Sequence, residues 1–226
     1  MEKTADYRNF VIFIHIPKTA GTSLWRGFEA AQSAHEIVKK YRPDSPQTTQ
    51  KYVKQFETLE GRQKIFDDFS PDGPPGKPLF LCGHITALKY AKVFPLNRFS
   101  TFLRDPVKRV ISSHAAWCRR HNENKSLEEY ITLPSARNVQ SYHLSGIDVT
   151  NIGFLGLTEN YEADLGDFSK YSGIDVKYTQ FNRHGPEKLE LSADLIAQIE
   201  ELNSADVKLY DDAKKERIRR GGPLLK

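Results

Sequence analysis

The chain has 226 residues, 38% of them hydrophobic and 27% charged, and a formal net charge of +4. This length allows one large domain or two small ones with a sizeable core, and the small charge excess, without a long Lys/Arg block, predicts no nucleic-acid partner. No stretch approaches the roughly 18 apolar residues of a membrane helix, and the polar start of the chain lacks a signal-peptide core. We therefore expect a cytoplasmic protein with no membrane partner, in which Cys82 and Cys118 are buried, reduced thiols.

The first predicted elements are a strand, a helix and a long polar region. Residues 10–16, FVIFIHI, are β-branched and aromatic without clean alternation, which is typical of a strand covered on both faces. A helix is predicted over 21–33. Residues 35–78 are mostly polar and irregular, with a helix predicted over 47–68, and we interpret this region as a variable, substrate-facing insertion.

Strands and helices continue to alternate along the rest of the chain. The later strands are predicted at 79–84, 98–104, 154–158 and 176–181. The later helices are predicted at 106–121, 135–144 and 193–217, with a short helix capped by Ser126. Asp105 can cap the first of these helices, and Pro106 fits its first position. Because such alternation favours parallel strands, we predict a single α/β domain over 1–226, a P-loop-like α/β/α sandwich around a central parallel sheet.

The strand-to-helix turn I-H-I-P-K-T-A-G-T-S at residues 14–23 concentrates groups that bind anions. Such a turn leaves backbone N–H groups free, and the helix dipole adds positive character. The candidate residues are Lys18, Thr19, Ala20, Gly21, Thr22 and Ser23. The turn differs from the ATP loop G-x-x-x-x-G-K-[ST], because Lys18 precedes Gly21 and no acidic strand end obviously serves a metal. We predict a cradle for a phosphate-like anion, with no metal.

A second anion site is indicated by T-F-L-R-D-P-V-K-R-V-I-S-S-H at residues 101–114. Arg104 leaves a predicted strand at the edge where ligands collect in open α/β sheets. Its guanidinium can hold a phosphate through two parallel hydrogen bonds. Ser112 lies about two helical turns past the cap, so it returns toward the same side.

Both segments resemble the donor-binding motifs of sulfotransferases that use PAPS (3′-phosphoadenosine 5′-phosphosulfate). P-K-T-A-G-T-S resembles the 5′-phosphosulfate loop of that family, and the R-D-P helix resembles its 3′-phosphate site. The narrower resemblance is to the carbohydrate branch that includes heparan sulfate 2-O- and 6-O-sulfotransferases. Weaker similarities are the N-x-Q segment in 137–146, the G-x-T-E stretch in 154–165 and D-V-K-L-Y in the last helix.

The resemblance implies transfer of a sulfuryl group from PAPS to a hydroxyl of a carbohydrate or another small acceptor, with PAP as product. It implies that residues 18–23 bind the 5′-phosphosulfate and that Arg104 and Ser112 bind the 3′-phosphate. In this family a flexible segment often folds over the nucleotide, which makes Asn182 and Arg183 further donor-binding candidates. The insertion at 35–78 would then face the acceptor.

Sulfuryl transfer also needs a base for the acceptor's proton and positive charge for the leaving phosphate. Lys18 and the backbone N–H groups supply the charge. His84 ends a predicted strand directly after Gly83, at the same sheet edge as Lys18 and Arg104, and the G-H position carries the base in the glycan sulfotransferases. We therefore assign His84 as the catalytic base. Contributions of His15, His143 and His184 remain open.

Two other functions remain open from the sequence. An ATP- and magnesium-dependent P-loop phosphotransferase is one, although the order of the loop residues argues against it. A nucleotide-binding module without catalysis is the other. Independently of function, Asp206 falls on the apolar stripe of the last helix, and a buried carboxylate needs a partner. We predict that Arg109 is this partner and ties the last helix to the nucleotide-binding core.

Overall fold

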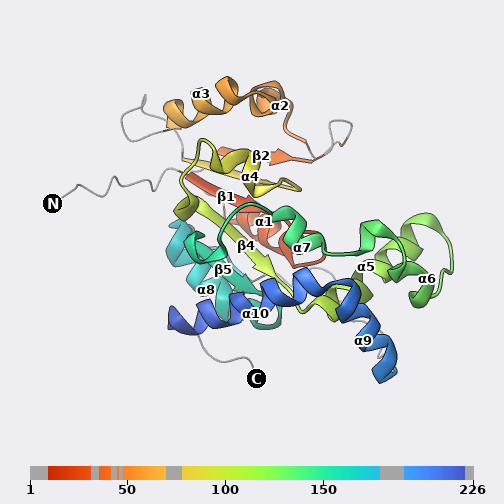
Figure 1. Cartoon of the computed structure of the whole chain (residues 1–226). Coiled ribbons are helices and arrows are strands. Elements are labelled where there is room, and N and C mark those ends of the chain that lie inside the picture. The colour runs from red at the N-terminus through yellow and green to blue at the C-terminus, as the bar shows by residue number, and fades with distance from the viewer. Residues whose placement is uncertain are drawn as a thin grey trace.

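A five-stranded parallel sheet forms the centre of the protein (Figure 1). The computed structural model describes residues 10–31, 36–41, 45, 48–69, 78–178 and 191–221. The strands are β1 (Phe10–Ile14), β2 (Glu36–Lys40), β3 (Leu79–Gly83), β4 (Phe99–Leu103) and β5 (Phe154–Leu157), in the order β2-β3-β1-β4-β5. Every neighbouring pair is parallel, which confirms the predicted α/β fold.

Helices cover both faces of the sheet. Helices α1 (Gly21–Ala30) and α8 (Tyr161–Ser172) pack on one face, and α2 (Gln50–Glu57), α3 (Leu59–Phe69), α4 (Ala87–Ala91) and α10 (Ser204–Arg219) pack on the other. Within β1, Val11 and Phe13 face the first group, whereas Phe10, Ile12 and Ile14 face the second. All five side chains are buried, which explains why this strand shows no polar alternation.

The remaining helices extend past the carboxyl ends of the strands. Helices α5 (Pro106–His121), α6 (Leu127–Ile131) and α9 (Ala193–Leu202) share a separate apolar cluster, and Figure 1 shows them beyond the end of β4. Helix α7 (Val139–His143) connects this group to the sheet. As predicted, Asp105 caps α5 by accepting a hydrogen bond from the Lys108 N–H (2.9 Å), Pro106 is its first residue, and Ser126 caps α6. Short 3₁₀ turns lie at Leu96–Arg98, Pro134–Ala136, Val149–Asn151 and Thr158–Asn160.

Two long predicted helices are each broken by one residue. The helix predicted over 47–68 is two helices, with Thr58 in extended conformation between α2 and α3. The helix predicted over 193–217 breaks at the buried Asn203, between α9 and α10. The Asn203 side chain donates to the Ile199 carbonyl (2.9 Å) and accepts from the Asn138 N–H (2.9 Å). The helix is therefore interrupted at Asn203, whose side chain binds Asn138, the residue directly before α7.

The region 35–78 contributes an edge strand that the sequence did not predict. Strand β2 pairs with β3, although its sequence EIVKK carries two lysines. Lys40 forms an ion pair with Glu57 of α2, and Lys39 forms one with Glu29 of α1, so both charges are matched. At the other end of the chain, residues 176–178 of the predicted strand 176–181 form no strand, and residues 179–181 lie outside the described part.

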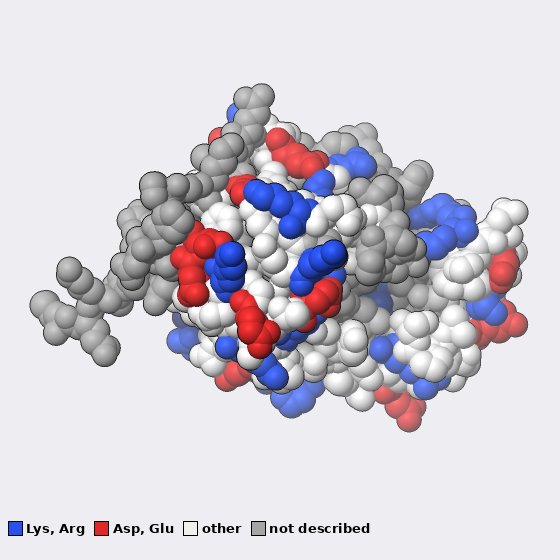
Figure 2. Space-filling view, turned by 90° about the horizontal axis from the view of Figure 1, so that it is seen from above, with Lys and Arg blue, Asp and Glu red and all other residues white. Residues whose placement is uncertain are grey.

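The face above α2 and α3 carries basic and acidic side chains next to one another (Figure 2). Ion pairs in this part of the chain include Lys51 with Glu36 (3.1 Å) and Lys89 with Glu57 (2.8 Å). This face therefore does not present a field of one sign. Among the described helices, none combines the length and the apolar character needed to span a bilayer.

Candidate active site

The turn after β1 has the backbone shape of an anion cradle. Lys18 and Ala20 both have positive φ angles, 72° and 66°, and Thr19 between them does not. Alternation of this kind turns successive N–H groups toward one point, and it costs energy for residues other than glycine. Gly21 follows as the first residue of α1, where a Cβ atom would lie 2.1 Å from the His15 ring. The turn is therefore held tightly against the end of β1.

The hydroxyl groups of this turn have different surroundings. The Thr19 hydroxyl is buried and donates to the Ile16 carbonyl (2.9 Å), so it holds the turn together. Thr22 is half-buried and makes no side-chain hydrogen bond within the described ranges, while Ser23 is buried along α1. Of the predicted cradle, the backbone N–H groups, Lys18 and Thr22 are therefore the groups best placed to meet an anion.

Arg104, in the second predicted anion site, lies in contact with Lys18, in the first. Its guanidinium donates to the Lys18 carbonyl (3.2 Å), across 86 positions of the chain. The Arg104 Nε is buried and has no partner among the described residues. Burial lowers the pKa of Arg104, and the carboxylates of Glu159 and Asp105 oppose that effect. Ser112 is half-buried on α5, two turns after Asp105, and its hydroxyl has no partner within the described ranges.

The backbone of Arg104 and Asp105 is clamped from two sides. The Gln140 side chain accepts from the Arg104 N–H (2.8 Å) and donates to the Arg104 carbonyl (2.9 Å), and it is fully buried. Glu159 accepts from the Asp105 N–H (3.0 Å) and from the Tyr210 hydroxyl (3.0 Å). These contacts give a physical reason for the N-x-Q, T-E and D-V-K-L-Y segments, whose individual roles the sequence did not reveal.

The predicted partner of Asp206 is confirmed, and Asp206 has a second role. Its carboxylate lies 3.8 Å from the Arg109 Nε, and both side chains are buried. It also accepts from the N–H groups of Gln140 (3.1 Å) and Ser141 (2.7 Å), at the start of α7. These N–H groups have no partner within the helix, so Asp206 caps α7 from outside. It thereby fixes the helix that holds Arg104.

Three histidines and a tyrosine meet at the carboxyl ends of β1, β2 and β3. The ring of His84 lies 4.7 Å from that of His15, 4.9 Å from that of Tyr41 and 6.4 Å from that of His143, measured between centroids. His15 Nδ1 is hydrogen-bonded to the Tyr41 hydroxyl (2.7 Å), and His143 Nδ1 donates to the Ile85 carbonyl (2.9 Å). His84 alone among the three histidines is exposed, which leaves it free to meet a substrate.

The imidazoles of this cluster are neutral at neutral pH. Burial, followed by the charges of His84, His143 and Lys18, lowers the pKa of His15 to about 3. Burial by the surrounding protein, followed by the charges of His143 and Arg120, lowers the pKa of His84 to about 4. Solvent still reaches His84, so loss of hydration acts less on it than on the buried His15. A neutral, accessible imidazole can accept a proton.

Other residues singled out in the sequence lie away from this cluster or outside the described part. His114 is hydrogen-bonded to the Lys125 carbonyl (2.7 Å), and His121 stacks on Trp117 (4.5 Å between centroids). Cys82 is buried as predicted, but Cys118 is half-buried, because its sulfur faces the loop at Lys125 and not the core. His35, Asn182, Arg183 and His184 lie outside the described residues.

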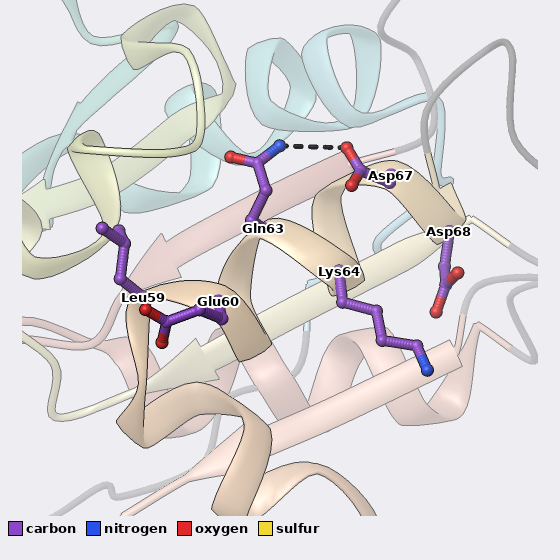
Figure 3. Close-up of a pocket in the computed structure, with 6 residues that line it drawn as sticks. All are labelled: Leu59, Glu60, Gln63, Lys64, Asp67 and Asp68. Atoms are coloured by element: carbon purple, nitrogen blue, oxygen red, sulfur yellow. Dashed lines mark hydrogen bonds between the residues drawn. The ribbon is translucent and has the colours of Figure 1, made fainter.

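One hollow among the described residues adjoins the site, and a second is lined by other residues. A hollow of about 530 Å³ after β5 is lined by Glu159, Asn160, Tyr161 and Tyr178, among others. The Tyr161 hydroxyl is buried without a partner in the described ranges, and the Tyr161 and Tyr178 rings are 6.0 Å apart. Figure 3 shows the other hollow, whose six lining residues all belong to α3. It contains none of the predicted site residues.

The fold is similar to that of a known enzyme. The crystal structure of a sulfotransferase from Alicyclobacillus acidocaldarius matches with a TM-score of 0.52 and 18% sequence identity, over 94% of this chain and 96% of that chain. No protein-family model and no curated protein matched the sequence. The chain therefore has the α/β fold of a sulfotransferase over almost its whole length.

Proposed function

We propose that this protein is a PAPS-dependent sulfotransferase that transfers a sulfuryl group to a hydroxyl of a carbohydrate or another small acceptor. The observation that carries the proposal is the contact between Arg104 and the Lys18 carbonyl. It brings together the two segments whose cationic side chains, Lys18 and Arg104, would meet the donor's two anionic ends. The Arg104 Nε is buried and has no partner among the described residues, which supports a ligand with a strong acceptor at this position.

We assign the rest of the donor to the neighbouring hollow. The turn at 18–23 would bind the 5′-phosphosulfate through backbone N–H groups and Lys18, and Arg104 with Ser112 would bind the 3′-phosphate. The hollow after β5 begins at Glu159, which also holds the Asp105 N–H, and it is bordered by the rings of Tyr161 and Tyr178. Aromatic rings beside a hollow suit a flat purine base. Asn182 and Arg183 remain donor-binding candidates.

The chemistry uses one base and one cation. The acceptor oxygen forms a bond to sulfur while the bond between sulfur and the bridging oxygen of the donor breaks. His84 takes the acceptor's proton, and PAP leaves with the electron pair of the broken bond. Lys18 and the N–H groups of the turn stabilise the negative charge that builds on the leaving phosphate. Holding donor and acceptor in line supplies much of the remaining acceleration.

Substitution Arg104→Gln tests the donor assignment. We expect the wild-type chain to bind PAP more tightly than 5′-AMP, which lacks the 3′-phosphate, and the variant to lose this difference. Charge-assisted hydrogen bonds of this kind change affinity by about 10- to 100-fold. Titration calorimetry with PAP, 5′-AMP and ATP, with and without magnesium, measures the effect, and Arg219→Gln on the surface of α10 is the matched control. Tighter binding of ATP with magnesium would favour a phosphotransferase instead.

Substitution Gln140→Leu tests whether the clamp on Arg104 matters for binding. The variant keeps the side-chain volume but leaves the Arg104 N–H and carbonyl without their partner, so we expect the free energy of unfolding to fall by about 2 kcal/mol. Because Arg104 is then less well placed, affinity for PAP should fall more than affinity for 5′-AMP. Chemical denaturation and calorimetry measure the two effects, with the exposed Gln63→Leu as control. Equal losses for both nucleotides would show that Gln140 is only structural.

A further inference from the structure

The His15 side chain is almost fully buried, and one of its two ring nitrogens has no role in the fold. The residue is 6% exposed, and its backbone continues the sheet past β1 by donating to the Gly83 carbonyl (2.9 Å). Its Nδ1 is hydrogen-bonded to the Tyr41 hydroxyl (2.7 Å). In the described part of the chain, its Nε2 forms no hydrogen bond. Because polar groups of buried side chains normally have a partner, a ligand is the expected partner of Nε2.

The edge of the ring that carries Nε2 faces the start of α1. A Cβ atom added to Gly21 would lie 2.1 Å from His15 Cδ2 and 2.5 Å from His15 Nε2. The first N–H groups of a helix have no acceptor within the helix, and those of Gly21 and Thr22 find none elsewhere among the described residues. The His15 Nε2 therefore lies beside backbone N–H groups that are free to bind an anion.

The same ring also lies next to His84. The two ring centroids are 4.7 Å apart, and no hydrogen bond joins the rings within the described ranges. In the proposed reaction, the sulfur atom lies between the leaving phosphate at the turn 18–23 and the acceptor hydroxyl at His84, because the transfer runs in line. His15 is in contact with Gly21 on one side and with His84 on the other. Its Nε2 is therefore beside the position that the sulfuryl group would occupy.

The hydrogen bond to Tyr41 determines what Nε2 can do. The His15 ring is neutral at neutral pH, so only one of its nitrogens carries a proton. If the Tyr41 hydroxyl donates to Nδ1, the proton is on Nε2, which can then donate to an anion. With the opposite tautomer, a lone pair on Nε2 would face the anion and repel it. No N–H group of the described residues donates to Nε2, as that lone pair would require.

We propose that His15 donates a hydrogen bond from Nε2 to an oxygen of the transferred sulfuryl group, and that Tyr41 holds the ring in the tautomer this needs. The inference rests on the proposed sulfotransferase function and adds a residue outside the turn 18–23. A hydrogen bond to a charged oxygen is stronger than one between neutral groups. The bond is made to PAPS but not to the product PAP, which has lost the sulfuryl group. His15 thereby distinguishes PAPS from PAP.

The ratio of the affinities for PAPS and PAP tests this inference. The variant His15→Asn keeps a polar group near the position of Nδ1 and removes the donor at Nε2, whereas His15→Gln reaches the position of Nε2 with an N–H group. We expect His15→Asn to lower affinity for PAPS about tenfold more than affinity for PAP, and His15→Gln to restore most of this difference. Calorimetry without an acceptor measures binding, and His121→Asn at the exposed end of α5 is the matched control.

The tautomer of His15 is a second readout, which a merely structural role would not fix. NMR of the ring nitrogens in the ligand-free chain at neutral pH reports which of them carries the proton. We expect the proton on Nε2 in the wild-type chain and a mixture of both tautomers in Tyr41→Phe. Because Tyr41→Phe leaves the His15 ring in place, it also keeps the inference testable if the His15 variants do not fold. Its affinity for PAPS should fall more than its affinity for PAP.

Equal effects of His15→Asn on the affinities for PAPS and PAP, including no effect on either, would overturn the inference. A proton on Nδ1 of His15 in the wild-type chain would also overturn it, and an unchanged tautomer in Tyr41→Phe would remove Tyr41 from it. Failure of the wild-type chain to bind either nucleotide is a different result, which contradicts the proposed function itself. In that case inorganic pyrophosphate is the probe, and equal affinity of the wild-type chain and His15→Asn for pyrophosphate, including no binding, would exclude His15 as an anion-binding residue.

Discussion

Substitution of His84 by asparagine is expected to lower kcat for sulfate transfer by about 10²- to 10⁴-fold, the range typical of a lost general base. Asparagine keeps a polar side chain of similar reach but cannot accept the acceptor's proton at neutral pH. His84 is exposed at the carboxyl end of β3, and neither the turn at 18–23 nor Arg104 depends on it for a hydrogen bond. Affinity for PAP should therefore stay close to that of the wild-type chain. Transfer of labelled sulfate from PAPS and calorimetry with PAP measure the two quantities.

The matched control for His84 is His143→Gln. His143 is buried and donates to the Ile85 carbonyl, and its ring lies 6.4 Å from that of His84. Its loss should leave most of the activity and raise the pKa of His84, because one of the charges that lower that pKa is removed. In NMR titrations of the ligand-free wild-type chain, His84 should titrate well below 6.5, so the base stays neutral as pH falls through 6. Unchanged turnover in His84→Asn would remove His84 from the mechanism.

Replacement of Lys18 by methionine is expected to lower kcat by about 10²- to 10³-fold, as the loss of a group that stabilises charge in the transition state does. In the proposed mechanism Lys18 is the cation at the cradle for the phosphosulfate, and negative charge builds on the bridging oxygen there only as the sulfuryl group leaves. Affinity for PAP should therefore fall less than kcat. Steady-state kinetics with PAPS and calorimetry with PAP separate the two effects. Equal losses in both would mean that Lys18 only binds the donor.

The melting temperature of the Lys18→Met variant shows whether its loss of activity reflects the site or unfolding of the chain. In the ligand-free chain, burial and the charges of Arg119, Arg104 and Arg120 all lower the pKa of Lys18. Each of these effects disfavours the charged lysine, so its removal should leave the melting temperature unchanged or raise it. Sites that bind highly charged substrates commonly destabilise the protein when the ligand is absent. A large drop in melting temperature would mean that the kinetic loss reflects unfolding.

Helix α7 connects the donor and the acceptor sides of the proposed site. In its first turn, the Gln140 side chain forms hydrogen bonds with the backbone of Arg104. Three residues later, the His143 ring lies next to that of His84. Asp206 of α10 caps the same helix through two N–H groups. A change in the position of α7 would therefore move the proposed 3′-phosphate site and the surroundings of His84 together.

The sequence alone was sufficient to predict the elements that carry the two candidate anion-binding motifs. Strand β1, the turn with Lys18, and the start of α5 at Asp105 and Pro106 all follow from neighbouring residues, because strand burial, capping and proline geometry act over a few positions. The same reasoning reached Arg109 and Asp206, since a buried carboxylate on an apolar stripe demands a partner.

Contacts between residues far apart in the chain decided the rest. The bond from Arg104 to the Lys18 carbonyl spans 86 positions, and the polar strand β2 exists because β3 pairs with it and Glu57 neutralises Lys40. Asn203 interrupts an otherwise continuous helical pattern because its side chain finds a partner in Asn138, 65 residues away. Helical spacing and strand propensity contain no information on such partners, so the clamp on Arg104 and the histidine cluster became visible only once the chain was folded.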